Sequence, residues 1–132
     1  MKILITGATG LIGNTLIPVL QKEQHTLSIL TRNKQKVKFQ KVTVYQSIDD
    51  IPTKAVFDII INLAGAPISK RWTQLYKQEL IKSRVETTRA LYGLVDRLET
   101  TPSLLINASA IGFYGDHGSL PIDEESEPNQ SF

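Results

Sequence analysis

Three glycines, Gly7, Gly10 and Gly13, stand three positions apart directly after the apolar run 2–6. Glycine permits a positive φ in a tight turn and lets backbone N–H groups approach a pyrophosphate closely. The apolar positions that follow recur at helical spacing, so the loop should open a helix whose N-terminus faces the anion. We therefore predict dinucleotide binding here, against the alternative of a purely structural turn. The predicted binding residues of this loop are Gly7, Thr9, Gly10, Leu11, Ile12 and Gly13.

A second candidate site lies at the end of the next apolar stretch, 27–31. Dinucleotide folds read the adenosine ribose about 20 residues after the glycines, where an acid favours NAD and an arginine accommodates the 2′-phosphate of NADP. Here Thr31 and Arg32 occupy that place, and no carboxylate is nearby. A guanidinium suits a phosphate by charge and by geometry, so this pair predicts NADP, with NAD as the less favoured cofactor. The alternative is that Arg32 merely begins a basic run.

Short apolar runs alternate with helical stretches, which is the pattern of βαβ units. The predicted strands cover 2–6, 27–31, 42–45, 56–63 and 104–108, and the predicted helices cover 11–24 and 73–99. The stretch 56–63, with Phe57 and the β-branched Ile59, Ile60 and Ile61, is typical of a central strand buried on both faces. Right-handed crossovers then predict a Rossmann-like α/β fold, a doubly wound parallel sheet of about five strands in order 3-2-1-4-5 with helices on both faces.

Ligands of such sheets bind at the carboxyl ends of the strands, which directs attention to the loops after residues 6, 31, 45, 63 and 108. Seven of the eight glycines lie in three of these loops. The long helix should turn an apolar stripe toward the sheet. That stripe is predicted to contain Ile81, Val85, Thr88, Leu91 or Tyr92, Val95 and Leu98.

The composition is that of one soluble globular domain: 132 residues, of which 41% are hydrophobic and 21% are charged. No apolar stretch reaches the roughly 18 residues that a membrane helix needs, and the first apolar run is too brief for a signal peptide. We therefore expect no membrane partner and a cytoplasmic location. The absence of cysteine excludes disulfides and thiolate ligands, and His25 and His117 have no partner at metal-ligand spacing, so no metal site is predicted.

The net charge of +2 hides an asymmetry along the chain. Residues 113–132 carry −5, whereas residues 1–112 carry +7. Five basic residues gather in ten positions: Arg32, Lys34, Lys36, Lys38 and Lys41. They indicate a solvated face or an attraction for phosphate on a small ligand. With one aromatic residue among them and no recognisable nucleic-acid module, a nucleic-acid partner is not predicted.

Three motifs together resemble the short-chain dehydrogenase/reductase superfamily. The T-G-x-x-G-x-x-G spacing of 6–13 is similar to its extended branch, which includes the sugar-nucleotide epimerases. Asn62-Leu63-Ala64-Gly65 resembles the N-x-A-G turn, and the run 109–115 resembles the serine-bearing region of extended members. A closer resemblance is to an atypical subgroup, the epimerase-family proteins of unassigned substrate, and it spans essentially the whole chain. The segments that carry it are 30–32, 62–68, 71–73, 83–85 and 109–116.

The resemblance implies roles for particular residues. Leu63, Ala64 and Gly65 would line the adenosine and nicotinamide ribose side of the cofactor. Ser109 would be the catalytic serine that hydrogen-bonds the reacting carbonyl or hydroxyl, a role that needs a short donor at a strand end. The alternative for Ser109 is a hydroxyl that only satisfies local backbone. The tyrosine of the 109–115 run is not the catalytic tyrosine of the superfamily.

The chain also departs from the superfamily pattern. Catalysis there relies on Tyr-x-x-x-Lys, and no such pair follows Ser109 in this sequence. Arg84 stands where extended members tend to have an asparagine. The structural role that this asparagine has in those members is therefore not assigned to a residue of this chain. Gln24 replaces the usual glycine before His25, so the first helix is expected to end without a left-handed glycine cap.

These observations predict an NAD(P)-binding Rossmann domain over 1–112, with an acidic tail over 113–132 that leads to a missing C-terminal catalytic and substrate portion. The intact protein would be an oxidoreductase or epimerase acting on a small-molecule hydroxyl or carbonyl substrate, nucleotide-sugars among the options, and a homo-oligomer is possible. The alternatives are a non-catalytic NADP-binding or redox-sensing module and an inactive truncated fragment.

Overall fold

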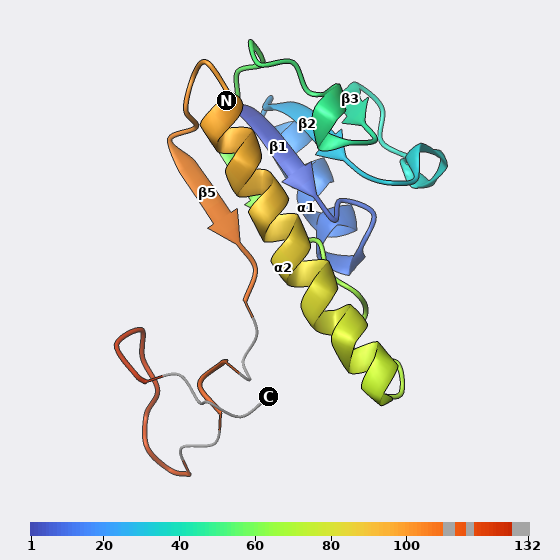
Figure 1. The fold of residues 1–132 in the computed structure, drawn as a ribbon. Coiled ribbons are helices and arrows are strands. Elements are labelled where there is room, and N and C mark those ends of the chain that lie inside the picture. Colours follow the sequence, from blue (N-terminus) through green and yellow to red (C-terminus); the bar gives the residue numbers. More distant parts are fainter. Residues whose placement is uncertain (110–112, 116–117, 128–132) are drawn as a thin grey trace.

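The computed structural model describes residues 1–109, 113–115 and 118–127. Its centre is a five-stranded parallel sheet in the order β3-β2-β1-β4-β5 (Figure 1). The order confirms the predicted doubly wound topology. The strands are β1 (Lys2–Thr6), β2 (Thr26–Leu30), β3 (Val42–Tyr45), β4 (Ile59–Asn62) and β5 (Leu104–Asn107).

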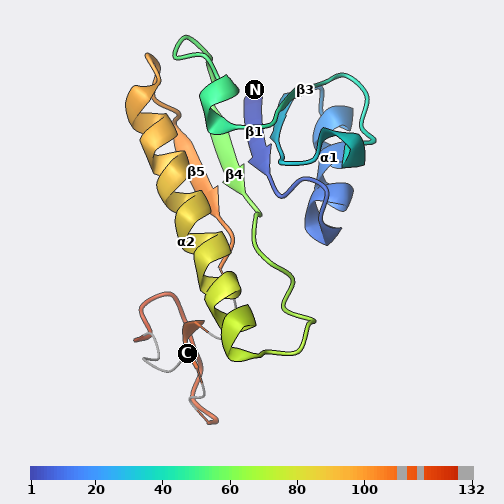
Figure 2. The same ribbon diagram turned by 45° about the vertical axis from the view of Figure 1, so that its right-hand side comes forward.

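Two helices cover opposite faces of the sheet (Figures 1 and 2). Helix α1 (Leu11–Lys22) links β1 to β2, and helix α2 (Gln74–Arg97) links β4 to β5. Thr73 caps α2 by accepting the backbone N–H of Tyr76, as a helix N-terminus requires. Two short 3-10 turns, η1 (Lys34–Lys36) and η2 (Ile48–Asp50), flank β3.

The alternation of side chains along β1 divides the core into two clusters. Ile3 and Ile5 point to the α1 face and Leu4 points to the α2 face, because successive strand residues point to opposite faces. All three are at most 2% exposed. The buried cluster on the α1 face contains Ile3, Ile5, Ala8, Ile17, Leu27, Ile29 and Ile61. The cluster on the α2 face contains Leu4, Ile51, Phe57, Ile60, Leu91, Leu94 and Leu98.

The predicted inward stripe of α2 is only partly right. Leu91 and Leu98 are buried as predicted, but Ile81, Val85 and Tyr92 are 47%, 38% and 68% exposed. Leu80 and Leu94 are buried instead. The α2 helix has 24 residues, about 36 Å at 1.5 Å per residue, whereas the strands have four or five residues, at most about 17 Å. Its N-terminal half therefore extends past the carboxyl ends of the strands (Figure 2). The exposed Ile81, Val85 and Tyr92 share one side of α2, and the buried Leu80, Leu91 and Leu94 share the side one residue away, so the helix is rotated relative to the prediction.

The predicted strand over 56–63 is also shorter in the structure, at Ile59–Asn62. Its partner β1 has only five residues, so the ladder ends where β1 ends. Before β4, the backbone N–H of Asp58 donates to the carbonyl of Lys2, and the Asp58 carboxylate accepts the N–H of Lys2. Phe57 is nevertheless buried, which explains why its apolar run extends beyond the strand.

Helix α1 ends with a left-handed residue that is not glycine. Gln24 has φ +59°, its N–H donates to the carbonyl of Gln21 at 3.0 Å, and the N–H of His25 donates to the carbonyl of Leu20 at 3.1 Å. This is the Schellman arrangement, which normally places glycine at the left-handed position. The expectation of no glycine cap is confirmed, yet the left-handed turn forms with glutamine in it.

The Gln24→Gly variant should be more stable than the wild type by about 1 kcal/mol, because a left-handed backbone costs an L-residue roughly that much and costs glycine little. Urea unfolding measures the difference. As a matched control, Lys22→Gly, inside the last turn of α1, should lower stability by up to about 1 kcal/mol. A Gln24→Gly variant that is less stable than the wild type would contradict this account.

The remaining described segments, 113–115 and 118–127, contain no α-helix or strand. The acidic tail predicted over 113–132 thus lies partly in turns and partly outside the described residues. Within the described chain, no helix combines the length and the apolar character needed to cross a membrane.

Candidate functional site

The loop after β1 has a conformation that glycine alone satisfies at its first position. Gly7 has φ +68°, and the N–H of Gly10 donates to its carbonyl at 3.0 Å, closing a tight turn. A Cβ on Gly7 would lie 2.4 Å from the carbonyl oxygen of Leu63, at the end of β4. Both the positive φ and the close approach of β4 therefore exclude a larger residue here.

The start of α1 leaves backbone donors open at the same end of the sheet. Gly10 is the N-cap residue and supplies no side chain to the cap. The first helical hydrogen bond runs from the N–H of Asn14 to the carbonyl of Gly10 at 2.9 Å. The N–H groups of Leu11 and Ile12 thus have no acceptor within the helix. A Cβ on Gly13 would lie 2.4 Å from the carbonyl oxygen of Ala8, so this glycine allows the helix to pack against the loop. Such an N-terminus attracts an anion.

A cleft of about 690 Å³ lies at the carboxyl ends of the strands. It brings together the glycine loop, the end of β2 and the turn after β4. The predicted residues that line it are Gly7, Thr9, Gly10, Thr31, Arg32, Leu63, Ala64 and Gly65. Leu11 and Ile12 are 88% and 60% exposed at the helix start and do not line the cleft, and Gly13 is buried behind the loop.

The end of β2 holds the backbone in place while leaving the Arg32 side chain open. The N–H of Thr31 donates to the carbonyl of Tyr45 at 2.9 Å, and the hydroxyl of Thr31 accepts the N–H of Asn33 at 3.4 Å. Asn33 in turn caps η1 by accepting the N–H of Gln35. Arg32 is exposed, and within the described part of the chain its guanidinium has no hydrogen-bond or ion-pair partner.

A row of hydrogen-bonded polar side chains joins three strand ends beside the cleft. The hydroxyl of Thr6 donates to Oδ1 of Asn62 at 2.6 Å, and Nδ2 of Asn62 donates to Oδ1 of Asn107 at 2.6 Å. Thr88 from α2 donates to the same oxygen of Asn107 at 3.3 Å, and the N–H of Ala64 donates to Oδ1 of Asn62 at 3.2 Å. Thr6 and Asn62 are 2% and 4% exposed. This row fixes the ends of β1, β4 and β5 relative to one another.

Ser109 lies two residues beyond β5 and is exposed. The backbone of β5 is still held beside β4 at Ala108, whose N–H donates to the carbonyl of Asn62 at 2.9 Å. Ser109 is not among the residues that line the cleft. Residues 110–112 of its motif lie outside the described residues, so the catalytic role of Ser109 stays a prediction.

The cleft also has walls that the sequence-based prediction missed. One wall is the loop that follows β3. The sequence could have indicated this wall, because the loop after residue 45 lies at the carboxyl end of a predicted strand. The other wall belongs to residues 79–90 of α2, which no periodicity argument placed over the cleft. Lys82 and Glu86 on this wall form an ion pair at 3.9 Å. The additional lining residues are Thr6, Leu30, Gln46, Ser47, Ile48, Ala66, Glu79, Lys82, Ser83, Glu86, Thr87 and Ala90.

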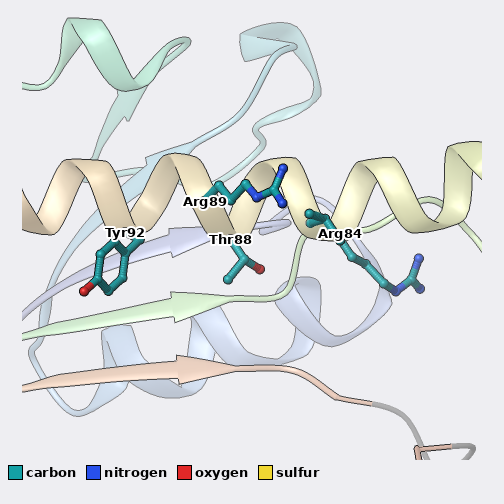
Figure 3. A pocket seen from close by; sticks show the side chains of 5 residues that line it. Arg84, Thr88, Arg89 and Tyr92 are labelled. Atoms are coloured by element: carbon teal, nitrogen blue, oxygen red, sulfur yellow. The ribbon is translucent and has the colours of Figure 1, made fainter. Parts of the chain in front are cut away.

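A second, shallower groove of about 440 Å³ runs along α2. Figure 3 shows Arg84, Thr88, Arg89 and Tyr92 along it, with Thr88 pointing toward β4 and β5. It contains none of the predicted cofactor residues. Among the described residues, no group of three His, Asp or Glu side chains is placed to hold a metal ion.

The geometry of the cleft agrees with a comparison of the chain with known protein families. The profile of the NAD dependent epimerase/dehydratase family matches residues 3–132. The chain belongs to this family. This match confirms the resemblance to the extended short-chain dehydrogenase/reductases that the sequence motifs indicated.

Curated members of the epimerase family have similar sequences. An epimerase family protein of Staphylococcus aureus (strain bovine RF122 / ET3-1) is 40% identical over 114 residues, and one of Staphylococcus saprophyticus is 39% identical over 116 residues. Each alignment covers 84% of this chain. The chain spans 38% of the length of these relatives.

Solved structures of epimerase family proteins share the fold. The human epimerase family protein SDR39U1, crystallised with NADPH, aligns with a TM-score of 0.79 at 24% identity, covering 97% of this chain and 43% of its own. A UDP-glucose 4-epimerase from Stenotrophomonas maltophila, crystallised with NAD and formylated UDP-arabinopyranose, aligns with a TM-score of 0.78 at 20% identity, covering 98% and 43%. At these identities the likeness concerns the fold alone.

Substituting two glycines should separate steric need from helix propensity. We expect Gly7→Ala to destabilise the protein by several kcal/mol, because a Cβ there would overlap Leu63 and the backbone has a positive φ. Gly93 lies within α2, and a Cβ added there would have no atom within 4 Å, so Gly93→Ala should stabilise by about 0.5–1 kcal/mol. Urea unfolding of both variants checks this; equal effects on stability would contradict the close approach at Gly7.

Proposed function

We propose that this chain is the NADP-binding part of an atypical short-chain dehydrogenase/reductase. The observation that carries the proposal is that the glycine loop, the α1 N-terminus and Arg32 adjoin one cleft at the carboxyl ends of the strands. A dinucleotide needs hydrogen-bond donors for its pyrophosphate and a separate contact for each nucleoside. The glycine loop follows β1, Arg32 follows β2, and Gly65 follows β4 on the other side of β1.

The space at the glycine loop suits a pyrophosphate. A Cβ on Gly7 would overlap the end of β4, and one on Gly10 would lie 3.2 Å from the carbonyl oxygen of Gly7, so side chains there would close the approach to the backbone. The open N–H groups at the start of α1 then offer donors to the phosphate oxygens. Gly65 and Ala64 would lie beside the ribose units.

The choice of NADP over NAD rests on Arg32. Its guanidinium is exposed at the cleft rim and is not engaged by any carboxylate in the described part of the chain, so it is available to a 2′-phosphate. The solved relatives include one with NADPH and one with NAD, and Arg32 is the local feature that favours the first for this chain.

For the whole protein we propose oxidoreductase or epimerase chemistry on a small hydroxyl or carbonyl compound, with nucleotide-sugars as one class to test. A bound nicotinamide would supply the hydride acceptor or donor. Ser109, at the carboxyl end of β5, would hydrogen-bond the substrate oxygen. No Tyr-x-x-x-Lys follows Ser109 in the sequence, so a proton-transfer group would have to be supplied by other residues.

A second candidate is a non-catalytic NADP-binding or sensing module. It is favoured by the position of Ser109, which does not line the cleft in this structure. Both candidates share the cofactor site, and NADPH-dependent turnover abolished by Ser109→Ala would separate them. A cytoplasmic location and a homo-oligomeric state stay predictions from the sequence.

The Arg32→Gln variant should bind NADPH about 10- to 100-fold more weakly, because it removes a charge-assisted contact to the 2′-phosphate. Its affinity for NADH, which lacks that phosphate, should change less than about twofold on the same reasoning. Isothermal titration calorimetry at fixed salt measures both affinities.

Lys38→Gln is the matched control, since Lys38 belongs to the same basic run but does not line the cleft. It should change NADPH affinity by no more than about twofold, as expected for a screened surface charge. NADH binding to the wild type as tightly as NADPH, or an equal loss in both variants, would rule out the NADP assignment.

A further inference from the structure

The segment after β4 is fixed by side chains of α2 and of Trp72, which precedes that helix. Residues 63–66 have no regular secondary structure, and neither do the next few positions. The hydroxyl of Tyr76 donates to the carbonyl of Pro67 at 2.6 Å, and Nε1 of Trp72 donates to the carbonyl of Ile68 at 3.0 Å. Side chains at the start of α2 and just before it thus bond backbone carbonyls that have no strand partner, because the strands have already ended (Figure 2).

Two adjacent residues of α2 hold Ala66 from both sides of its backbone. The Ser83 hydroxyl oxygen accepts the N–H of Ala66 at 2.9 Å, and both terminal nitrogens of Arg84 donate to the carbonyl of Ala66, at 3.5 and 3.4 Å. Both side chains also donate to the carbonyl of Leu80, each at 3.1 Å. The planar guanidinium offers several donors at once, which explains how one side chain serves two carbonyls.

Gly65 is shaped to receive this arginine. A Cβ on Gly65 would lie 3.2–3.4 Å from three atoms of the Arg84 guanidinium, so the guanidinium lies directly against the glycine. Figure 3 shows Arg84 leaving α2 near the loop that follows β4. Gly65, Ala66 and Ser83 all line the main cleft. In the clasp, defined as Ser83 and Arg84, Ser83 therefore lies at the cleft itself, whereas Arg84 lines the separate groove along α2.

The strand order assigns this turn to one half of a bound dinucleotide. The glycine loop follows β1, Arg32 follows β2, and Gly65 follows β4 on the other side of β1. With the pyrophosphate at β1 and the 2′-phosphate at β2, the nicotinamide half must extend over the end of β4. We infer that Ser83 and Arg84 are positioning residues, which hold the Gly65–Ala66 turn where the nicotinamide half binds. This inference rests on the proposed function.

The test measures the binding of two ligands to the 132-residue chain, and the hydrogen exchange of one backbone amide without ligand. Ser83→Ala and Arg84→Ala should each weaken NADPH binding about three- to tenfold. This is the effect expected from the loss of one or two hydrogen bonds, neutral for Ser83 and charge-assisted but long for Arg84. Binding of 2′,5′-ADP, which lacks the nicotinamide half, should change less than about twofold. Hydrogen exchange of the Ala66 amide without ligand should become about tenfold faster in Ser83→Ala.

Two further variants serve as matched comparisons. Ser83→Thr keeps the hydroxyl and should retain wild-type NADPH affinity and Ala66 exchange. Arg89→Ala removes an exposed cation that lies on the same helix and has no hydrogen-bond partner in the described part of the chain, and it should change neither. Thermal unfolding of each variant establishes that it is folded.

Equal losses of NADPH and 2′,5′-ADP affinity, or unchanged NADPH affinity despite faster Ala66 exchange, would overturn the positioning role. Unchanged Ala66 exchange in Ser83→Ala would overturn the clasp itself, whatever the ligands do. If the wild type binds neither ligand while the exchange result is as expected, the proposed function fails and the clasp is then only a structural feature.

Discussion

The site depends on how the ends of three parallel strands are joined, and the buried amide of Asn62 makes that joint. Its oxygen accepts from the hydroxyl of Thr6 and the N–H of Ala64, and its nitrogen donates to Asn107. A buried amide without such partners would cost about 1–3 kcal/mol for each group left unpaired. Because the amide has donors and acceptors on opposite sides, one side chain orients the starts of the loops after β1, β4 and β5 together.

The close approach of Gly7 to Leu63 completes this joint. The row of hydrogen-bonded polar side chains fixes the strand ends. The absence of a side chain at Gly7 lets the loops after β1 and β4 come together around the cleft. The two helices then act differently. Helix α1 presents its N-terminus to the cleft, whereas α2 extends past the sheet and supplies a wall and the Ser83–Arg84 clasp.

The fold could be predicted because its signals are local. The glycine spacing, the apolar strand runs and right-handed crossovers lead to the observed strand order. The inward face of α2 was predicted less well, since apolar residues lie on two neighbouring sides of this helix and periodicity alone does not say which side meets the sheet. Ile81 and Val85 fit the predicted stripe but are exposed, whereas Leu80, one position away around the helix, is buried together with Leu91 and Leu94.

Residue type and spacing along continuous segments were enough to predict the glycine loop, the arginine after β2 and the family. Which side chains meet can be seen only in the folded chain. Arg84 lies 19 positions from Gly65 in sequence, yet its guanidinium lies against that glycine. Tyr76, Ser83 and Arg84 bond the turn after β4 because a helix longer than its sheet must extend beside it. Such contacts depend on the lengths and packing of separate elements, which no local pattern contains.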